Sequence, residues 1–268
     1  MRLTVLLISC FFTPFVLAQE EVALLKSRLI QGGFYVGQVE PGTEVTYKKK
    51  SVRVSERGRF IVGFGRDASL QQTIFLKGKE GHTEEFKLKL TQREYKIQRI
   101  KGVAKKYVSP AEKVLGRIRD EGALVKSARQ YDSDLNDFFT GFDRPAEGPV
   151  SGVYGSQRYF NGEPRRPHFG LDIAGPEGAS VIAPADGVVR MAESDLYFSG
   201  GTIIVDHGFG ITTSYLHLSK VNVVEGQSVE RGETIGAIGA TGRVTGAHLD
   251  WRANWFDVRL DPALMMQD

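Results

Sequence analysis

Short runs of alternating apolar and polar residues dominate the first third of the chain. Residues 85–90 (Glu-Phe-Lys-Leu-Lys-Leu) alternate with a period of two, which is typical of a strand with one buried and one solvent-facing side. Similar runs between Gly- and Pro-containing turns predict strands at 32–39, 44–47, 51–54, 58–64 and 72–77. Short strands at this spacing predict a small β-sandwich over residues 19–106.

Residues 107–145 change to a helical period. Apolar residues recur at steps of three and four, or sums of these, and form one stripe: Val114, Ile118, Val125, Ala128, Leu135 and Phe138. The segment Ser109-Pro110-Ala111-Glu112 fits a capping box with proline at the first helical position. We therefore expect a helical connector, with Gly122 as a candidate break between two helices.

Residues 146–268 return to strands separated by glycines. The clearest strands are expected at 187–191, 202–206, 211–216 and 248–251, and no long helical pattern is present. The predicted fold class is therefore mainly β. A compact C-terminal β-sheet domain follows the small β-sandwich-like domain and the connector.

The first 18 residues predict a secretory signal peptide, because Arg2 precedes an apolar run, 3–17, that ends at Ala18. A buried N-terminal strand is the alternative. Residues 7–10 also resemble a lipoprotein cleavage box that would lipidate Cys10, but the residues after Cys10 remain apolar. Cleavage after Ala18 leaves no cysteine, and hence no disulfide or thiolate ligand. We expect an exported, periplasmic or cell-envelope protein whose mature chain has no transmembrane span.

Composition excludes several classes of protein and leaves the partner open. With 41% hydrophobic and 25% charged residues among 268, the chain is not disordered, collagen-like or a multi-spanning membrane protein. The net charge is only +3, yet residues 47–106 hold 17 Lys or Arg against 6 Asp or Glu. This basic segment is either a solvated charged face or a patch for an anionic lipid or envelope polymer. Nucleic acid is not an expected partner of an exported protein.

Four of the five histidines fall in the C-terminal region: His168, His207, His217 and His248. His168 and Asp172 are four residues apart and face the same side of an extended segment. His248 and Asp250 flank Leu249 in a predicted strand and also share a face. Imidazole and carboxylate are competent zinc ligands, so the spacing predicts a metal site.

Five motifs in this region resemble the lysostaphin-type zinc metallopeptidases in order and spacing. They are His168-Phe-Gly-Leu-Asp172, the segments 182–189 and 205–210, Tyr215-Leu-His217-Leu-Ser219, and Gly246-Ala-His248-Leu-Asp250. The resemblance covers about residues 150–262. It implies a compact β domain that hydrolyses peptide cross-links of bacterial peptidoglycan with one Zn²⁺ ion.

Carried over to this sequence, the resemblance makes His168 and Asp172 zinc ligands. The family normally has a histidine as third ligand, and Asp250 stands at that position here. His217 and His248 match the two catalytic histidines that assist the water and stabilise the intermediate. Tyr215 and His207 fall at recurring positions near the groove and are candidate substrate-binding residues. Two carboxylate ligands would reduce the ion's effective charge and make its water less acidic.

The leading hypothesis is a zinc endopeptidase that acts on peptidoglycan peptide stems. The alternative is a catalytically degenerate member that binds or regulates another cell-wall hydrolase, and a third is a polymer-binding protein with a structural metal. A helical His-Glu-x-x-His motif is absent from the sequence, so the glutamate-base design of other metallopeptidases does not apply. Purely structural roles are expected for Trp251 and Trp255 as core residues, and His207 is also a candidate hydrogen-bonded turn residue.

Overall fold

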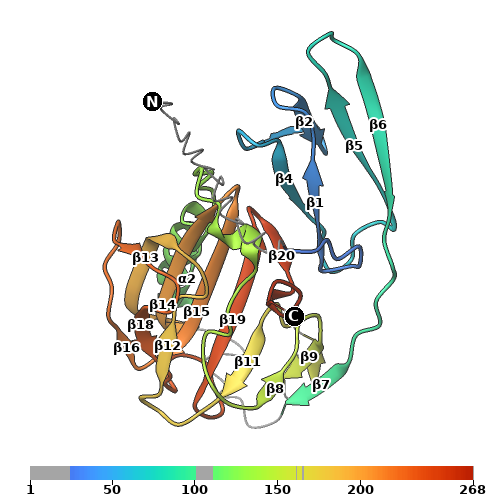
Figure 1. The fold of residues 1–268 in the computed structure, drawn as a ribbon. Helices are drawn as coiled ribbons and strands as arrows, with labels where there is room; N and C mark the ends of the chain where they lie inside the picture. The colour runs from blue at the N-terminus through green and yellow to red at the C-terminus, as the bar shows by residue number, and fades with distance from the viewer. Residues whose placement is uncertain (1–24, 101–110, 161, 165, 268) are drawn as a thin grey trace, which may run out of the picture.

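The computed structural model describes residues 25–100, 111–160, 162–164 and 166–267. The predicted signal peptide, with Cys10, and the start of the predicted capping box lie outside these residues. Figure 1 shows two groups of strands, one built from the N-terminal third and one from the C-terminal half. The fold is mainly β, and this prediction is confirmed.

The N-terminal strands form two small sheets. Strand β1 (Phe34–Gln38) pairs with β4 (Arg59–Gly63). The second sheet has the order β3-β2-β5-β6. Its strands are β2 (Glu44–Tyr47), β3 (Lys50–Val52), β5 (Gln71–Lys77) and β6 (Thr83–Lys89). All six strands expected here from the alternating pattern are present, with ends shifted by one or two residues at most positions.

A seventh strand, β7 (Ile97–Ile100), was missed by the sequence pattern. It leaves the N-terminal sheets and pairs in parallel with β9 (Gln157–Phe160), which β10 (Glu163–Pro164) extends. A four-residue edge strand carries too little periodicity to be recognised, since its partner lies about sixty residues away. The chain therefore joins the second half of the molecule before the connector begins.

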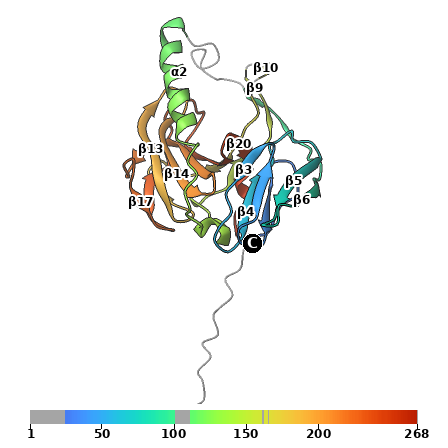
Figure 2. The same cartoon turned by 90° about the horizontal axis from the view of Figure 1, so that it is seen from above.

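The connector forms one helix, α2 (Glu112–Ser127), which ends earlier than the apolar stripe suggests. The expected break at Gly122 is wrong: a glycine inside a helix costs about 1 kcal/mol but does not by itself end it. No α2 side chain is fully buried, and Figure 2 shows the helix extending from the body of the protein. Phe138 lies instead in the short helix η1 (Asp137–Thr140), where it is buried.

The C-terminal half is built on one large antiparallel sheet with the order β17-β13-β14-β15-β19-β11-β8, with β20 paired to β19. A smaller sheet has the order β12-β18-β16. The bounds are β8 Val150–Gly152, β11 Leu171–Ala174, β12 Ser180–Ile182, β13 Gly187–Leu196, β14 Gly200–Gly208, β15 Ile211–Leu218, β16 Lys220–Val221, β17 Ser228–Val229, β18 Thr234–Ala237, β19 His248–Trp255 and β20 Val258–Leu260, before the short helix η2 (Pro262–Leu264). Strand β19 lies between β15 and β11, so three motif-bearing strands are neighbours.

A single hydrophobic core joins the N-terminal sheets to the large sheet. The ring of Tyr47 lies 5.8 Å from that of Trp255. Trp251 and Trp255 are both buried, as expected of core residues. The domain boundaries at 106 and 145 stay predictions, because the core does not divide at either of them. Among the residues the structure describes, no helix has the length and apolar character needed to cross a membrane.

The contact between the two halves makes a prediction at Gly63. A Cβ atom there would lie 2.8 Å from Cβ of Trp255 and 2.9 Å from Cδ2 of Leu260. Because overpacking of a dense core is destabilising, Gly63→Ala should lower the free energy of unfolding by about 1–3 kcal/mol. Gly65→Ala is the matched control, since its nearest neighbour would be 3.8 Å away. Urea denaturation measures both, and equal stability of the two variants would contradict this description of the interface.

Candidate functional site

His168, Asp172 and Asp250 converge on one point at the end of the large sheet. Each offers one ligand atom, and these atoms lie within 4.8 Å of one another. The convergence follows from strand pairing, because Asp172 on β11 is directly opposite Asp250 on β19. His168 lies in the loop that enters β11, and all three residues are buried.

Three polar atoms of this cluster have no hydrogen-bond partner among the described residues. Both ring nitrogens of His168 are buried without a hydrogen-bond partner among the described residues, and so is Oδ1 of Asp172. His168 Nε2 lies 3.0 Å from Asp172 Oδ1, but the two atoms are not aligned for a hydrogen bond. Buried polar atoms in folded proteins nearly always have partners, so these atoms point to a ligand that binds at this position.

Each carboxylate is also held by an arginine. Arg158 donates to Oδ2 of Asp172 at 2.8 Å. Arg252 donates to both oxygens of Asp250, at 2.9 and 2.5 Å. Burial alone would raise the pKa of Asp250, but the Arg252 guanidinium keeps this pKa far below its usual range. Asp250 is therefore ionised, and both carboxylates are fixed in orientation by their arginines.

The close packing around Asp250 explains a glycine in the first motif. A Cβ atom at Gly170 would collide with Oδ1 of Asp250 and crowd the Arg252 side chain. Only a residue without a side chain lets the loop before β11 approach the carboxylate this closely. The sequence His-Phe-Gly-Leu-Asp therefore supplies two residues of the cluster, His168 and Asp172, and its glycine leaves the space that Asp250 requires.

His217 and His248 lie beside this cluster, with their ring centroids 5.0 Å apart. His217 Nδ1 is 2.9 Å from the carbonyl oxygen of Thr241, and His248 Nδ1 is 2.8 Å from that of Gly246. A carbonyl only accepts, so Nδ1 carries the proton in both rings. In the neutral form, each Nε2 then presents a lone pair.

The orientation of His217 is set by an unusual backbone. Its φ of 68° is left-handed, which is costly for a residue with a side chain and is often found at functional sites. Burial lowers the pKa of His217 to about 4, so the ring is neutral near pH 7. His248 lies at the start of β19, and its Nε2 is 3.9 Å from Oδ1 of Asp172.

Tyr215 and His207 are fully buried in the sheet and do not line the cavity over the cluster, so substrate contact by either one stays a prediction. His207 Nδ1 donates to the Asp186 carbonyl at 2.7 Å, so its Nε2 accepts from the Thr213 hydroxyl at 2.7 Å. Tyr215 then donates to the Thr213 oxygen at 2.8 Å. The three side chains form a buried hydrogen-bond chain. His207 is hydrogen-bonded as expected of a structural residue, but it lies in β14 rather than in a turn.

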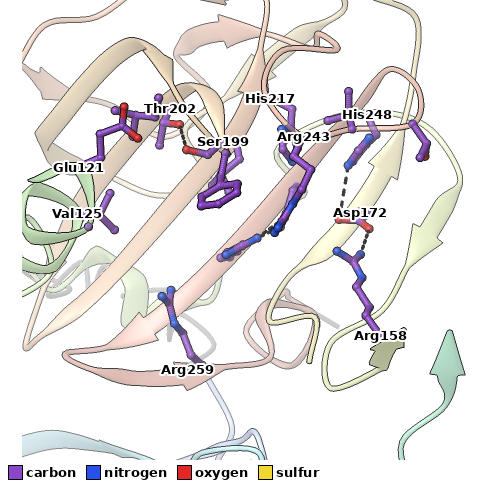
Figure 3. A pocket seen from close by; sticks show the side chains of 18 of the residues that line it. Glu121, Val125, Arg158, Asp172, Ser199, Thr202, His217, Arg243, His248 and Arg259 are labelled. Carbon is purple, nitrogen blue, oxygen red and sulfur yellow. Dashed lines mark hydrogen bonds and ion pairs between the residues drawn. The ribbon is translucent and has the colours of Figure 1, made fainter. Parts of the chain in front are cut away.

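A cavity of about 660 Å³ opens over the cluster and is lined by Asp172, His217, His248 and Asp250 among others. Figure 3 shows Asp172 between His248 and Arg158, with His217 nearby. The cavity wall also includes arginines that the sequence reasoning missed: Arg99, Arg129, Arg158, Arg243, Arg252 and Arg259. Arg252 was detectable, because alternation along a strand puts it on the same face as His248 and Asp250. Nothing local in the sequence indicates the others.

Known proteins resemble this chain in the region of the cavity. Residues 166–262 match Peptidase family M23. The crystal structure of a protein assigned to peptidase M23 from Pseudomonas aeruginosa is 31% identical, with a TM-score of 0.73, and the alignment covers 90% of this chain and 96% of that one.

Two curated relatives from Vibrio cholerae are similar over shorter regions. Peptidoglycan DD-endopeptidase ShyA is 48% identical over 85 residues, which cover 32% of this chain and 20% of the relative. Peptidoglycan DD-endopeptidase ShyB is 37% identical over 135 residues, which cover 47% of this chain and 30% of the relative. The chain thus matches between a fifth and a third of the length of these relatives.

The buried chain at His207 predicts acid sensitivity. Burial lowers the pKa of His207 to about 4, whereas an unfolded histidine titrates near pH 6.5. The unfolded state therefore binds more protons below pH 6.5, and stability falls as the pH drops from 6.5 towards 4. From pH 7 to pH 5 this one residue should cost about 2 kcal/mol of unfolding free energy.

The substitution His207→Gln should remove that share of the pH dependence. The free energy of unfolding is measured by urea denaturation at pH 7 and pH 5, and the difference between the two pH values is compared with that of the wild type. His217 also has a lowered pKa, so some acid sensitivity should remain in the variant. An unchanged difference would show that His207 is not buried in its neutral form.

Proposed function

This chain belongs to peptidase family M23, and from that premise we propose that it is a zinc-dependent endopeptidase that hydrolyses peptide cross-links of bacterial peptidoglycan. One observation carries the proposal. Three buried ligand-type residues, of which His168 and Asp172 have polar atoms without partners, lie beside two histidines whose Nε2 atoms can accept protons. A structural metal alone would give no reason for the two histidines beside the ligands, His217 and His248.

The residues present fit a zinc ion. Imidazole nitrogen and carboxylate oxygen are both zinc ligands, and three protein ligands are typical of a catalytic site. His168 and Asp172 have buried atoms without partners that point into the cluster, and Asp250 completes the set. When bound, the ion would polarise a scissile carbonyl and lower the pKa of a water molecule.

The arginines change the net charge that the two carboxylates bring to the site. The sequence alone suggested that Asp172 and Asp250 would reduce the effective charge of the ion. Arg158 and Arg252 bring two positive charges to the same two carboxylates, so these four side chains sum to zero charge. We therefore expect the acidity of the water to be higher than the His-Asp-Asp ligand set implies by itself.

His217 and His248 carry the proton transfers in the proposed mechanism. Each holds its Nδ1 proton on a backbone carbonyl, which orients the ring and leaves Nε2 as a base. The low pKa of His217 keeps its ring neutral at pH 7, as a proton acceptor requires. A ring that gains the proton then supplies it to the leaving amine or supports the oxyanion.

Peptidoglycan peptide stems are the proposed substrate. Both Vibrio relatives are peptidoglycan DD-endopeptidases, and a cavity of about 660 Å³ is large enough for a peptide. A periplasmic or envelope location follows from this substrate and from the predicted signal peptide. Binding of an anionic lipid or polymer by the basic segment stays a prediction.

A second candidate function is regulation of another hydrolase by a protein that has lost activity. The observation in its favour is that Arg252 occupies both oxygens of Asp250 and so competes with a metal ion. A carboxylate oxygen has more than one lone pair, however, and can accept from a guanidinium while it binds a metal. The competing functions differ in metal content and in release of muropeptides from purified peptidoglycan.

The proposed ligand set predicts which histidines control zinc binding. His168→Ala should weaken zinc affinity at least about 100-fold, because it removes one of three protein ligands. His82→Ala is the control, since His82 is exposed and far along the chain. Titration calorimetry with buffered zinc and metal analysis of the purified proteins measure both variants. Undiminished zinc affinity in His168→Ala would exclude this site.

The proposed base predicts a separation of binding from turnover. His217→Gln should lower kcat for muropeptide release by about 10²–10⁴, the contribution typical of a general base, and leave the zinc content unchanged. Rates on purified peptidoglycan, followed by chromatography of the released peptides, give the first quantity. If zinc is lost together with activity, His217 is a ligand rather than a base.

A further inference from the structure

The Arg129 guanidinium in the cavity wall has no counter-ion among the described residues. Arg129 follows the C-terminal end of α2, lines the cavity and is 7% exposed. Its Nε is buried without a hydrogen-bond partner, and no residue in the described part of the chain forms an ion pair with it. A buried charge without a partner is costly, so folded proteins seldom keep one that has no use.

The neighbours of Arg129 increase this cost. Burial first, and then the charges of Arg259 and Arg252, lower the pKa of Arg129 well below its usual value. Asp257 acts in the opposite direction, but it is exposed and accepts a hydrogen bond from Gln130. The site thus concentrates positive charge where water is scarce.

The carboxylates of this wall already have other partners, so they do not serve as a counter-ion for Arg129. Arg252 is committed to Asp250. Arg259, on β20, donates to Asn254, which is uncharged, and burial lowers the pKa of Arg259 to about 10. The third carboxylate of the cavity, Glu121, accepts from Arg117 and from the backbone of Tyr197. The wall around Arg129 and Arg259 is therefore left with a positive surplus.

We propose that Arg129 and Arg259 form a carboxylate-binding subsite of the cavity, which holds a free carboxylate of the peptide whose amide lies at His217 and His248. The inference rests on the proposed function for its peptide, but the subsite follows from the arginines alone. Guanidinium groups bind carboxylates through paired, charge-assisted hydrogen bonds. Peptide stems carry free carboxylates on side chains or at the chain end, and either supplies this chemistry.

The subsite has a defined place relative to the proposed reaction. Arg252 is close to both regions, since it holds Asp250 and its charge acts on both Arg129 and Arg259. A carboxylate bound there would supply the missing counter-ion and fix the position of the peptide along the cavity. Remote binding of this kind is used to place a scissile bond against the catalytic groups.

The test compares matched ligands and variants in the full-length protein. The ligands are a muropeptide with free carboxylates and versions in which the side-chain or the terminal carboxylate is converted to the carboxamide. The variants are Arg129→Met, which removes the charge, Arg129→Lys, which keeps it, and Arg119→Gln, which removes an exposed charge from the preceding helix α2. Calorimetry gives Kd, cleavage of the cross-linked forms gives KM and kcat, and thermal denaturation checks folding.

Wild-type protein should bind the free-carboxylate peptide at least about ten-fold more tightly than one of the two amidated peptides, which identifies the carboxylate used. Arg129→Met should abolish this preference, Arg129→Lys should retain part of it, and Arg119→Gln should match the wild type. The Tm of Arg129→Met without ligand should be equal to or above that of the wild type, because an unpaired buried charge is gone.

The two proposals fail in distinguishable ways. Binding that prefers the carboxylate, without any cleavage, keeps the subsite and rejects the endopeptidase. Cleavage with equal affinity for free and amidated peptides keeps the endopeptidase and rejects the subsite. A preference that survives in Arg129→Met, or no binding of the free-carboxylate peptide by the wild type, also overturns the subsite.

Discussion

The antiparallel pairing of β11 with β19 sets two negative charges directly opposite each other. Asp172 and Asp250 share one register position in this ladder, and both are buried. Like charges this close would be strongly destabilising without compensation. Arg158 and Arg252 supply this compensation. His168, in the loop before β11, completes the cluster around which the rest of the site is arranged.

The histidines follow from the same pairing of strands. Strand β19 also pairs with β15, with Asp250 opposite Leu216, so His217 at the next position lies beside the carboxylates. The left-handed backbone at His217 and the Thr241 carbonyl turn its ring to one orientation. This strained backbone does not stabilise the sheet. Its cost is explained by the orientation that it gives to the His217 ring.

Local patterns in the sequence determine much of this molecule, and long-range contacts determine the rest. Alternation located the strands, and the order of five motifs pointed to the family and to the residues that meet at His168, Asp172 and Asp250. Tyr215 and His207 belong to the same motifs, yet in the structure they form hydrogen bonds inside the core and do not line the cavity. A motif shows that residues matter together without showing which face of a buried sheet each one occupies.

The residues that sequence could not place are those that arrive from elsewhere in the chain. Arg158 reaches Asp172 from β9, and Arg129 comes from the end of a helix whose apolar stripe is not fully buried. Only their final positions reveal the surplus of positive charge in the cavity. No period or spacing within a segment records a contact of this kind, because the partners are set by the topology.

Asp250 and this positive wall are best understood as parts of one arrangement. A histidine at position 250, as the family resemblance would suggest, would leave Arg252 without its carboxylate and beside two further arginines. Three mutually repelling guanidiniums would then share the cavity wall, and the carboxylates of Asp172 and Asp257 would be the remaining anions that act on them. The carboxylate at 250 offsets Arg252, and the two residues sit on one face of β19 two positions apart. The departure from the usual ligand is therefore coupled to the charge of the cavity, and a single substitution at 250 would alter both the metal ligands and the electrostatics of the peptide-binding wall.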